Sequence, residues 1–260
     1  MMKWVRGSKV GSGRSSGVTL VVAAVVISLL LFSTQIYIYR LSRTRTDENY
    51  GTLSDYILGI EQGSRHVVVA SLINVSQGGS VSNFGYNLNR WESFVASDYK
   101  FGRCTLNSTL TSETPYSGGI WLSWGTEGMG VSSASAVLTM DIGGRGVEVD
   151  WSFTENITTT LLVSGRFETV QANIKRVTVF VHLLNEGAPA LADSIDLMYQ
   201  RGGWRDPTIL DDYDQTDYGN GTYRFSFSDE LPVSEIIIRV QAYDCRGISV
   251  QADASFTLDV

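Results

Sequence analysis

Hydrophobic and polar residues follow three different patterns along the chain. Residues 17–39 are uncharged and mostly aliphatic, and at about 1.5 Å per residue they can cross a hydrocarbon core of about 30 Å. Hydrophobic side chains then recur at helical spacing in residues 53–75, and again in residues 88–99. From residue 119 onward, β-branched and aromatic residues dominate between Gly-rich turns. The pattern predicts a transmembrane helix, two further helices and a long β-region.

The β-region divides into two parts by its rhythm. Residues 119–170 contain long β-rich runs, with a hairpin predicted at Gly143-Gly144-Arg145-Gly146. Residues 171–260 contain short runs with a period of two, which are typical of a β-sandwich. The predicted fold is thus a transmembrane helix, an α+β ectodomain of helices then antiparallel sheet, and an all-β sandwich. The predicted segments are a basic tail (1–16), the transmembrane helix (17–39), a linker and stalk helix (40–75), the α+β ectodomain (76–170) and the sandwich (171–260).

Charge separates the N-terminal region from the rest of the chain. The first 45 residues contain seven Lys and Arg and no carboxylate, whereas the 260-residue chain has a formal net charge of −7. The remaining residues therefore carry a charge of −14, which argues against nucleic acid as a partner. Membrane lipid is the expected partner of residues 17–39. Basic residues flank both ends of this stretch, so the charge bias alone does not orient it.

Motifs on the C-terminal side of the predicted membrane helix indicate export. Four Asn-x-Ser/Thr sequons occur there and are candidate glycosylation sites; they begin at Asn74, Asn107, Asn156 and Asn220. Cys104 and Cys245 also lie on this side, and two alternatives stay open for them: one disulfide bond, or two buried thiols. We therefore predict a cytoplasmic N-terminus, a cell-membrane anchor and an extracellular C-terminal region.

Two stretches near the C-terminus resemble a known class of module. Residues 218–227, YGNGTYRFSF, and residues 236–247, IIIRVQAYDCRG, are similar to the "NGTY" strand and the penultimate strand of Ig-like modules in prokaryotic surface proteins. The resemblance covers about a third of the chain. It implies that the predicted sandwich is Ig-like and acts as a spacer or adhesion module.

The N-terminal region resembles archaeal type IV pilin-like proteins. The resemblance rests on the basic tail ending in Arg14-Ser-Ser-Gly17, the aliphatic helix, the amphipathic helix after it and the β-rich head. It implies an archaeal surface protein and a filament-forming role. The sequence departs from bacterial-type pilins, because it has no Glu five residues into the aliphatic helix. This departure puts in question whether a prepilin-type peptidase cleaves the chain near Gly17.

The sequence contains no recognisable catalytic motif, so it does not predict an enzyme. The chain has two histidines, His66 and His182, and no Walker loop, C-x-x-C or H-E-x-x-H. The acidic stretch 206–221 offers the one candidate cofactor, because Ca²⁺ accepts six to eight oxygen ligands in irregular geometry. Its candidate ligands are Asp211, Asp212, Asp214 and Asp217. The alternative is a solvated acidic loop, and no other cofactor is expected.

These observations predict a single-pass, membrane-anchored extracellular surface protein. We expect it to have a structural, adhesion or interaction role, without catalysis. Its candidate partners are another cell-surface protein or a second copy of the chain. A pilin-like filament subunit is one alternative. A ligand-binding or hydrolytic ectodomain is another, and it would require a cleft in which carboxylates or aromatic side chains converge.

Overall fold

The chain divides into two compact units between Leu58 and Gly59. The computed structural model describes residues 27–36, 50–99, 102–144, 147–171 and 173–258. In the first unit, residues 27–36 form a helix whose large apolar side chains are more than half exposed, up to 68% for Phe32. Among the described residues, no helix combines the length and apolarity needed to cross a membrane. Residues 17–26 and 37–39 of the predicted span lie outside the described part of the chain.

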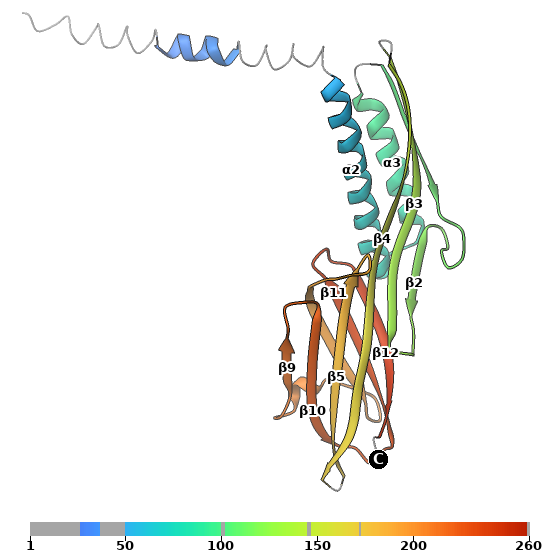
Figure 1. Cartoon of the computed structure of the whole chain (residues 1–260), viewed down its shortest axis with the longest axis vertical. Coiled ribbons are helices and arrows are strands. Elements are labelled where there is room, and N and C mark those ends of the chain that lie inside the picture. The colour runs from blue at the N-terminus through green and yellow to red at the C-terminus, as the bar shows by residue number, and fades with distance from the viewer. Residues whose placement is uncertain (1–26, 37–49, 100–101, 145–146, 172, 259–260) are drawn as a thin grey trace, which may run out of the picture. The chain divides into compact units, whose positions relative to one another are not determined.

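Two helices precede the sheets, as the hydrophobic spacing predicts. They are α2 (Tyr50–Ser76) and α3 (Ser82–Asp98). Within the second unit, α2 buries Val68 and Leu72, and α3 buries Phe84, Leu88 and Val95. Both helices lie beside the upper half of a long β-hairpin (Figure 1). Each therefore follows the amphipathic pattern in which one apolar stripe faces a core.

Antiparallel pairing builds the first and larger sheet. Within the described residues it contains eight strands, with the central order β1-β3-β4-β5-β10-β9, while β2 pairs with β3 and β6 with β5. The bounds are β1 (Arg103–Leu110), β2 (Ile120–Trp124), β3 (Met129–Gly144), β4 (Val147–Gln171), β5 (Ile174–Asn185), β6 (Ala188–Pro189), β9 (Asp214–Asp217) and β10 (Thr222–Glu230). The predicted hairpin is confirmed, because β3 ends and β4 begins around residues 145–146.

The second sheet packs against the lower half of the first (Figure 1). In the described residues it has four strands in the order β12-β11-β7-β8. Their bounds are β7 (Ala192–Gln200), β8 (Trp204–Arg205), β11 (Glu235–Asp244) and β12 (Ser249–Thr257), and a short 3₁₀ helix, η2 (Pro207–Ile209), follows β8. One hydrophobic core joins the two sheets, with Phe225, Phe227 and Tyr199 among its largest buried side chains. The structure thus confirms helices followed by antiparallel sheets that form a sandwich.

The long β3–β4 hairpin belongs to both halves of the second unit. Its upper part pairs with β1 and packs against the helices, whereas Leu161, Val163 and Phe167 of β4 enter the sandwich core. Strand β4 also pairs with β5 from Thr159 onward. The sequence-derived boundary at residues 170/171 consequently falls in the turn of a continuous β4–β5 hairpin, inside one compact unit.

Candidate functional site

Helix α3 is held against α2 by polar contacts that recur about once per helical turn. Trp91 Nε1 donates a hydrogen bond to Ser64 Oγ at 2.9 Å, and Asn87 Nδ2 donates to Ser71 Oγ at 3.0 Å. The Trp91 ring lies directly over Gly63, where an added Cβ would overlap it. These contacts fix the rotation of α3 about its own axis, and they determine which of its faces is left outside.

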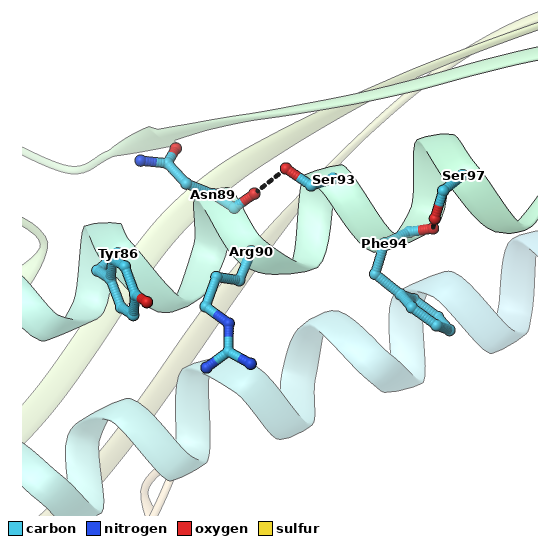
Figure 2. A pocket seen from close by; sticks show the side chains of 6 residues that line it. All are labelled: Tyr86, Asn89, Arg90, Ser93, Phe94 and Ser97. Atoms are coloured by element: carbon cyan, nitrogen blue, oxygen red, sulfur yellow. Dashed lines mark hydrogen bonds between the residues drawn. The ribbon is translucent and has the colours of Figure 1, made fainter.

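The outward face of α3 forms a shallow groove of about 480 Å³ (Figure 2). Its lining residues all come from this helix: Tyr86, Asn89, Arg90, Ser93, Phe94 and Ser97. Figure 2 shows Tyr86, Arg90 and Phe94, spaced four residues apart, projecting from one side of the helix. Tyr86 and Phe94 are 62% and 54% exposed. Such a row of exposed aromatic side chains is uncommon on a surface that faces only water.

Arg90 is the charged group of this groove. Its guanidinium lies over the Tyr86 ring, 5.8 Å from the ring centroid. The Phe94 ring stacks on the Trp91 ring, with the two ring centroids 5.4 Å apart. Ser93 and Ser97 turn their hydroxyls back to the backbone oxygens of Asn89 and Phe94. Among the residues that the structure describes, no carboxylate pairs with Arg90. The groove offers aromatic faces and one cation, which are groups that contribute to binding surfaces.

The candidate calcium ligands do not converge. Asp214 pairs with Arg224 at 2.5 Å, Asp212 Oδ1 accepts from the Ser228 backbone N–H at 3.0 Å, and Asp217 Oδ1 accepts from the Gly219 N–H at 2.7 Å. Asp214 and Asp217 lie three residues apart on β9, so their side chains point to opposite faces. No group of three or more metal-ligating side chains is present within the described ranges.

One cysteine lies on a strand of the larger sheet and the other in a turn of the smaller sheet, and no disulfide bond joins them. Cys104 is buried on β1, opposite Ile142 of β3. Cys245 is exposed in the turn between β11 and β12, where its thiol donates to the Leu191 carbonyl oxygen at 3.3 Å. An exposed thiol of this kind is accessible to labelling reagents.

All four sequon asparagines are exposed, and they occupy four different elements. They are Asn74 near the end of α2, Asn107 on β1, Asn156 on β4 and Asn220 in the turn before β10. Asn107 lines a second hollow, of about 350 Å³, on the outer face of the larger sheet. Exposure is the property that a glycan acceptor needs, so each of the four stays a candidate.

Sequence reasoning missed the groove on α3, although the sequence contains a signal for it. The residues Leu88, Trp91 and Val95 mark the core-facing stripe of this helix, and the opposite face should then be polar. Tyr86 instead places an aromatic ring on that opposite face, and Phe94 places an exposed one at the edge of the stripe, stacked on Trp91. An amphipathic helix with aromatic residues on both faces indicates a surface with a role of its own.

No protein-family model matches the sequence, and no curated protein matches it.

Proposed function

We propose that this protein is a single-pass surface protein, anchored in the cell membrane through residues 17–39, with a cytoplasmic tail and an extracellular C-terminal region. The observation that carries the proposal is the helix at residues 27–36. Its large apolar side chains, including Leu30 at 60% and Leu31 at 63%, are exposed along the whole described length. A contiguous apolar surface of this kind is stable in lipid and unfavourable in water.

Three further observations support export and a role as a spacer or adhesion protein. The four sequon asparagines are exposed, and the body that contains them is strongly acidic, as suits a solvated surface. The two packed sheets support the proposal of an Ig-like module that contains residues 171–260 together with the end of β4, and its expected role is that of a spacer or adhesion domain.

The groove on α3 is the surface that we assign to the interaction role. Tyr, Phe and Arg are enriched at protein interfaces, because they bury a large area and retain a polar contact. Arg90 has no carboxylate partner among the described residues, so the matching surface is an acidic patch on a protein partner. The chain itself is acidic, and a second copy is included in that class.

Thiol labelling of intact cells tests the orientation. A membrane-impermeant maleimide should label the exposed Cys245 on cells that produce the full-length chain, and the Cys245→Ser variant should lose this label. In the Cys245→Ser background, the Ser8→Cys variant places a thiol in the tail and should be labelled only after the cells are permeabilised. Labelling of the tail, with none at Cys245, would contradict the proposal.

A pilin-like filament subunit is the second candidate function. It is favoured by α2, a helix near the N-terminus that buries Ile60, Val68 and Leu72 beneath an antiparallel sheet. This arrangement is similar to the helix-and-sheet head that the pilin resemblance implies. N-terminal sequencing of the membrane-extracted protein separates the two functions. A mature N-terminus near Gly17 supports the subunit, and an intact N-terminal tail supports the permanent anchor.

A further inference from the structure

Asn107 differs from the other sequon asparagines in the state of its side chain. Asn107 and Thr109 lie two residues apart on β1, so both side chains point to the outer face of the sheet. Both are exposed, and within the described residues neither side chain makes a hydrogen bond. An enzyme can therefore reach the acceptor amide and the hydroxyl of this sequon together in the folded protein.

Each of the other three sequons has a member that is already engaged. Ser76, the partner of Asn74, is 2% exposed and its hydroxyl accepts a hydrogen bond from the Ser249 backbone N–H at 3.1 Å. Asn156 Oδ1 accepts hydrogen bonds from the hydroxyls of three residues, which are Tyr116, Ser133 and Thr158. Asn220 Oδ1 accepts from the Thr222 backbone N–H at 3.1 Å. The Ser76 hydroxyl is therefore out of an enzyme's reach in the folded protein, and the hydrogen bonds to Oδ1 hold the amides of Asn156 and Asn220 in fixed orientations.

The hollow beside Asn107 presents groups that bind sugar hydroxyls. It is lined by Asn107, Thr139, Met140, Asp141, Asp150, Trp151 and Ser152, and its volume of about 350 Å³ lies at the lower end of the range for ligand pockets. Asp141 and Asp150 are directly opposite each other on β3 and β4, an arrangement that is unfavourable for like charges. Asp141 pairs with Arg103 at 2.8 Å. Asp150 has no cation or hydrogen-bond donor among the described residues.

We propose that Asn107 is the principal N-glycosylation site and that this hollow seats the first sugars of its glycan. Hydroxyl groups of the sugars would donate hydrogen bonds to the Asp150 carboxylate, which can accept several of them. Thr139 and Ser152 supply further hydroxyls along the same face. The proposal rests on the proposed function, because only an exported chain meets the glycosylation machinery.

The covalent step is a glycosyl transfer. A bond forms between Asn107 Nδ2 and the anomeric carbon of a phosphate-activated sugar donor. The bond between that carbon and the phosphate oxygen breaks, so the phosphate leaves with the electron pair. The amide nitrogen loses one proton and stays an amide, and no oxidant or reductant takes part.

Glycopeptide mass spectrometry of the full-length protein from its exporting cells tests the site. Asn107 should have the highest occupancy of the four sequons. Asn107→Gln and Thr109→Val should each abolish the glycan at this position, while Thr109→Ser should retain it. Asn220→Gln is the matched control and should leave the Asn107 glycan unchanged. Glycans on other sequons with a bare Asn107 would overturn the proposal.

Thermal unfolding of the same full-length protein tests whether the hollow binds the first sugars of the glycan. The chain with the Asn107 glycan should melt about 2–4 °C above Asn107→Gln, and Asp150→Asn should abolish that difference although it also relieves the repulsion with Asp141. If the glycan raised the melting temperature equally in the Asp150→Asn background, the proposed contact between the hollow and the sugars would be overturned. An exported chain with no glycan would overturn this proposal alone, as Cys245 would still be labelled. A chain that is not exported would overturn this proposal and the proposed function together.

Discussion

Gly63 is a residue at which helix propensity and packing act in opposite directions. Glycine in a helix interior costs about 1 kcal/mol relative to alanine, yet here the Trp91 ring occupies the space that a Cβ would need. We expect Gly63→Ala to destabilise the fold by about 1–3 kcal/mol, because an added methyl group forces the ring out of place. Urea unfolding of the full-length protein in mild detergent, followed by tryptophan fluorescence, measures the change.

Gly59 provides the matched control on the same helix. Outside its chain neighbours and the backbone of its own helix, no atom lies within 4 Å of the position of its missing Cβ. Gly59→Ala should therefore stabilise the fold by about 0.5–1 kcal/mol through helix propensity alone. The two alanine variants should therefore shift the unfolding midpoint in opposite directions. A stabilising Gly63→Ala would show that Trp91 packs elsewhere in solution.

Asp229 links the stability of the sandwich to pH. Burial is the largest single influence on its carboxyl group and acts to raise the pKa, but the hydrogen bonds from Tyr199 and Arg201 together lower the pKa of Asp229 below its ordinary value of 3.8. A carboxylate whose pKa is depressed by folding stabilises the protein above its unfolded pKa, and this contribution is lost as the pH falls through the folded pKa. The effect is therefore present at neutral pH and disappears in acid.

The Asp229→Asn variant tests this linkage. It should lower the free energy of unfolding by about 1–3 kcal/mol at pH 7, because Tyr199 and Arg201 lose a charged acceptor. The difference from the unmodified protein should shrink as the pH falls below about 4. Unfolding midpoints measured between pH 2.5 and 7 check the profile, with the exposed Asp196→Asn as control. A difference that does not change with pH would contradict the linkage.

At the scale of elements, local periodicity predicts the helices and most strands, because each of them buries a single face. The predicted strand at residues 176–183 alternates as expected, with Val177, Val179 and Val181 fully buried. The sequence does not predict β1. Only Cys104 and Leu106 mark its buried face, and its outward Asn107 is of a residue type that is depleted in strands.

Strand β4 shows why the arrangement of the elements was harder to predict than the elements themselves. Its 25 residues read as one β-rich run, but the upper residues face helices and the lower residues face a second sheet. Pairing between distant strands leaves no mark in local spacing, so the sequence predicts two separate domains where one sheet runs through both. The candidate sites follow the same rule: motifs reveal the sequons, and only the fold shows that Asn107 lies in a hollow.

At the scale of the whole second unit, one turn joins the sandwich to the helices and to the long hairpin. This turn follows β11 and is organised by Asp244, which is fully buried. The Asp244 carboxylate accepts hydrogen bonds from Arg246 Nε at 2.7 Å, from Thr159 Oγ1 of β4 at 3.1 Å and from the Ile248 N–H at 2.9 Å. The end of α2 reaches the same turn, since Gln77 Nε2 donates to the Gly247 carbonyl oxygen at 3.0 Å.

Because three parts of the unit meet at this buried carboxylate, its removal should loosen all of them together. Asp244→Ala would leave Thr159 Oγ1 and the Ile248 N–H without this acceptor in a buried site, and Arg246 would keep only its ion pair with Glu186. We expect the variant to cost about 3–5 kcal/mol. Asp141→Ala breaks the exposed pair with Arg103 and should cost less than about 1 kcal/mol. Hydrogen exchange of the full-length protein should also show faster exchange at the end of α2 in Asp244→Ala only. Equal costs for the two variants, with α2 unchanged, would mean that the helices and the sandwich are held together by their apolar packing and not by this turn.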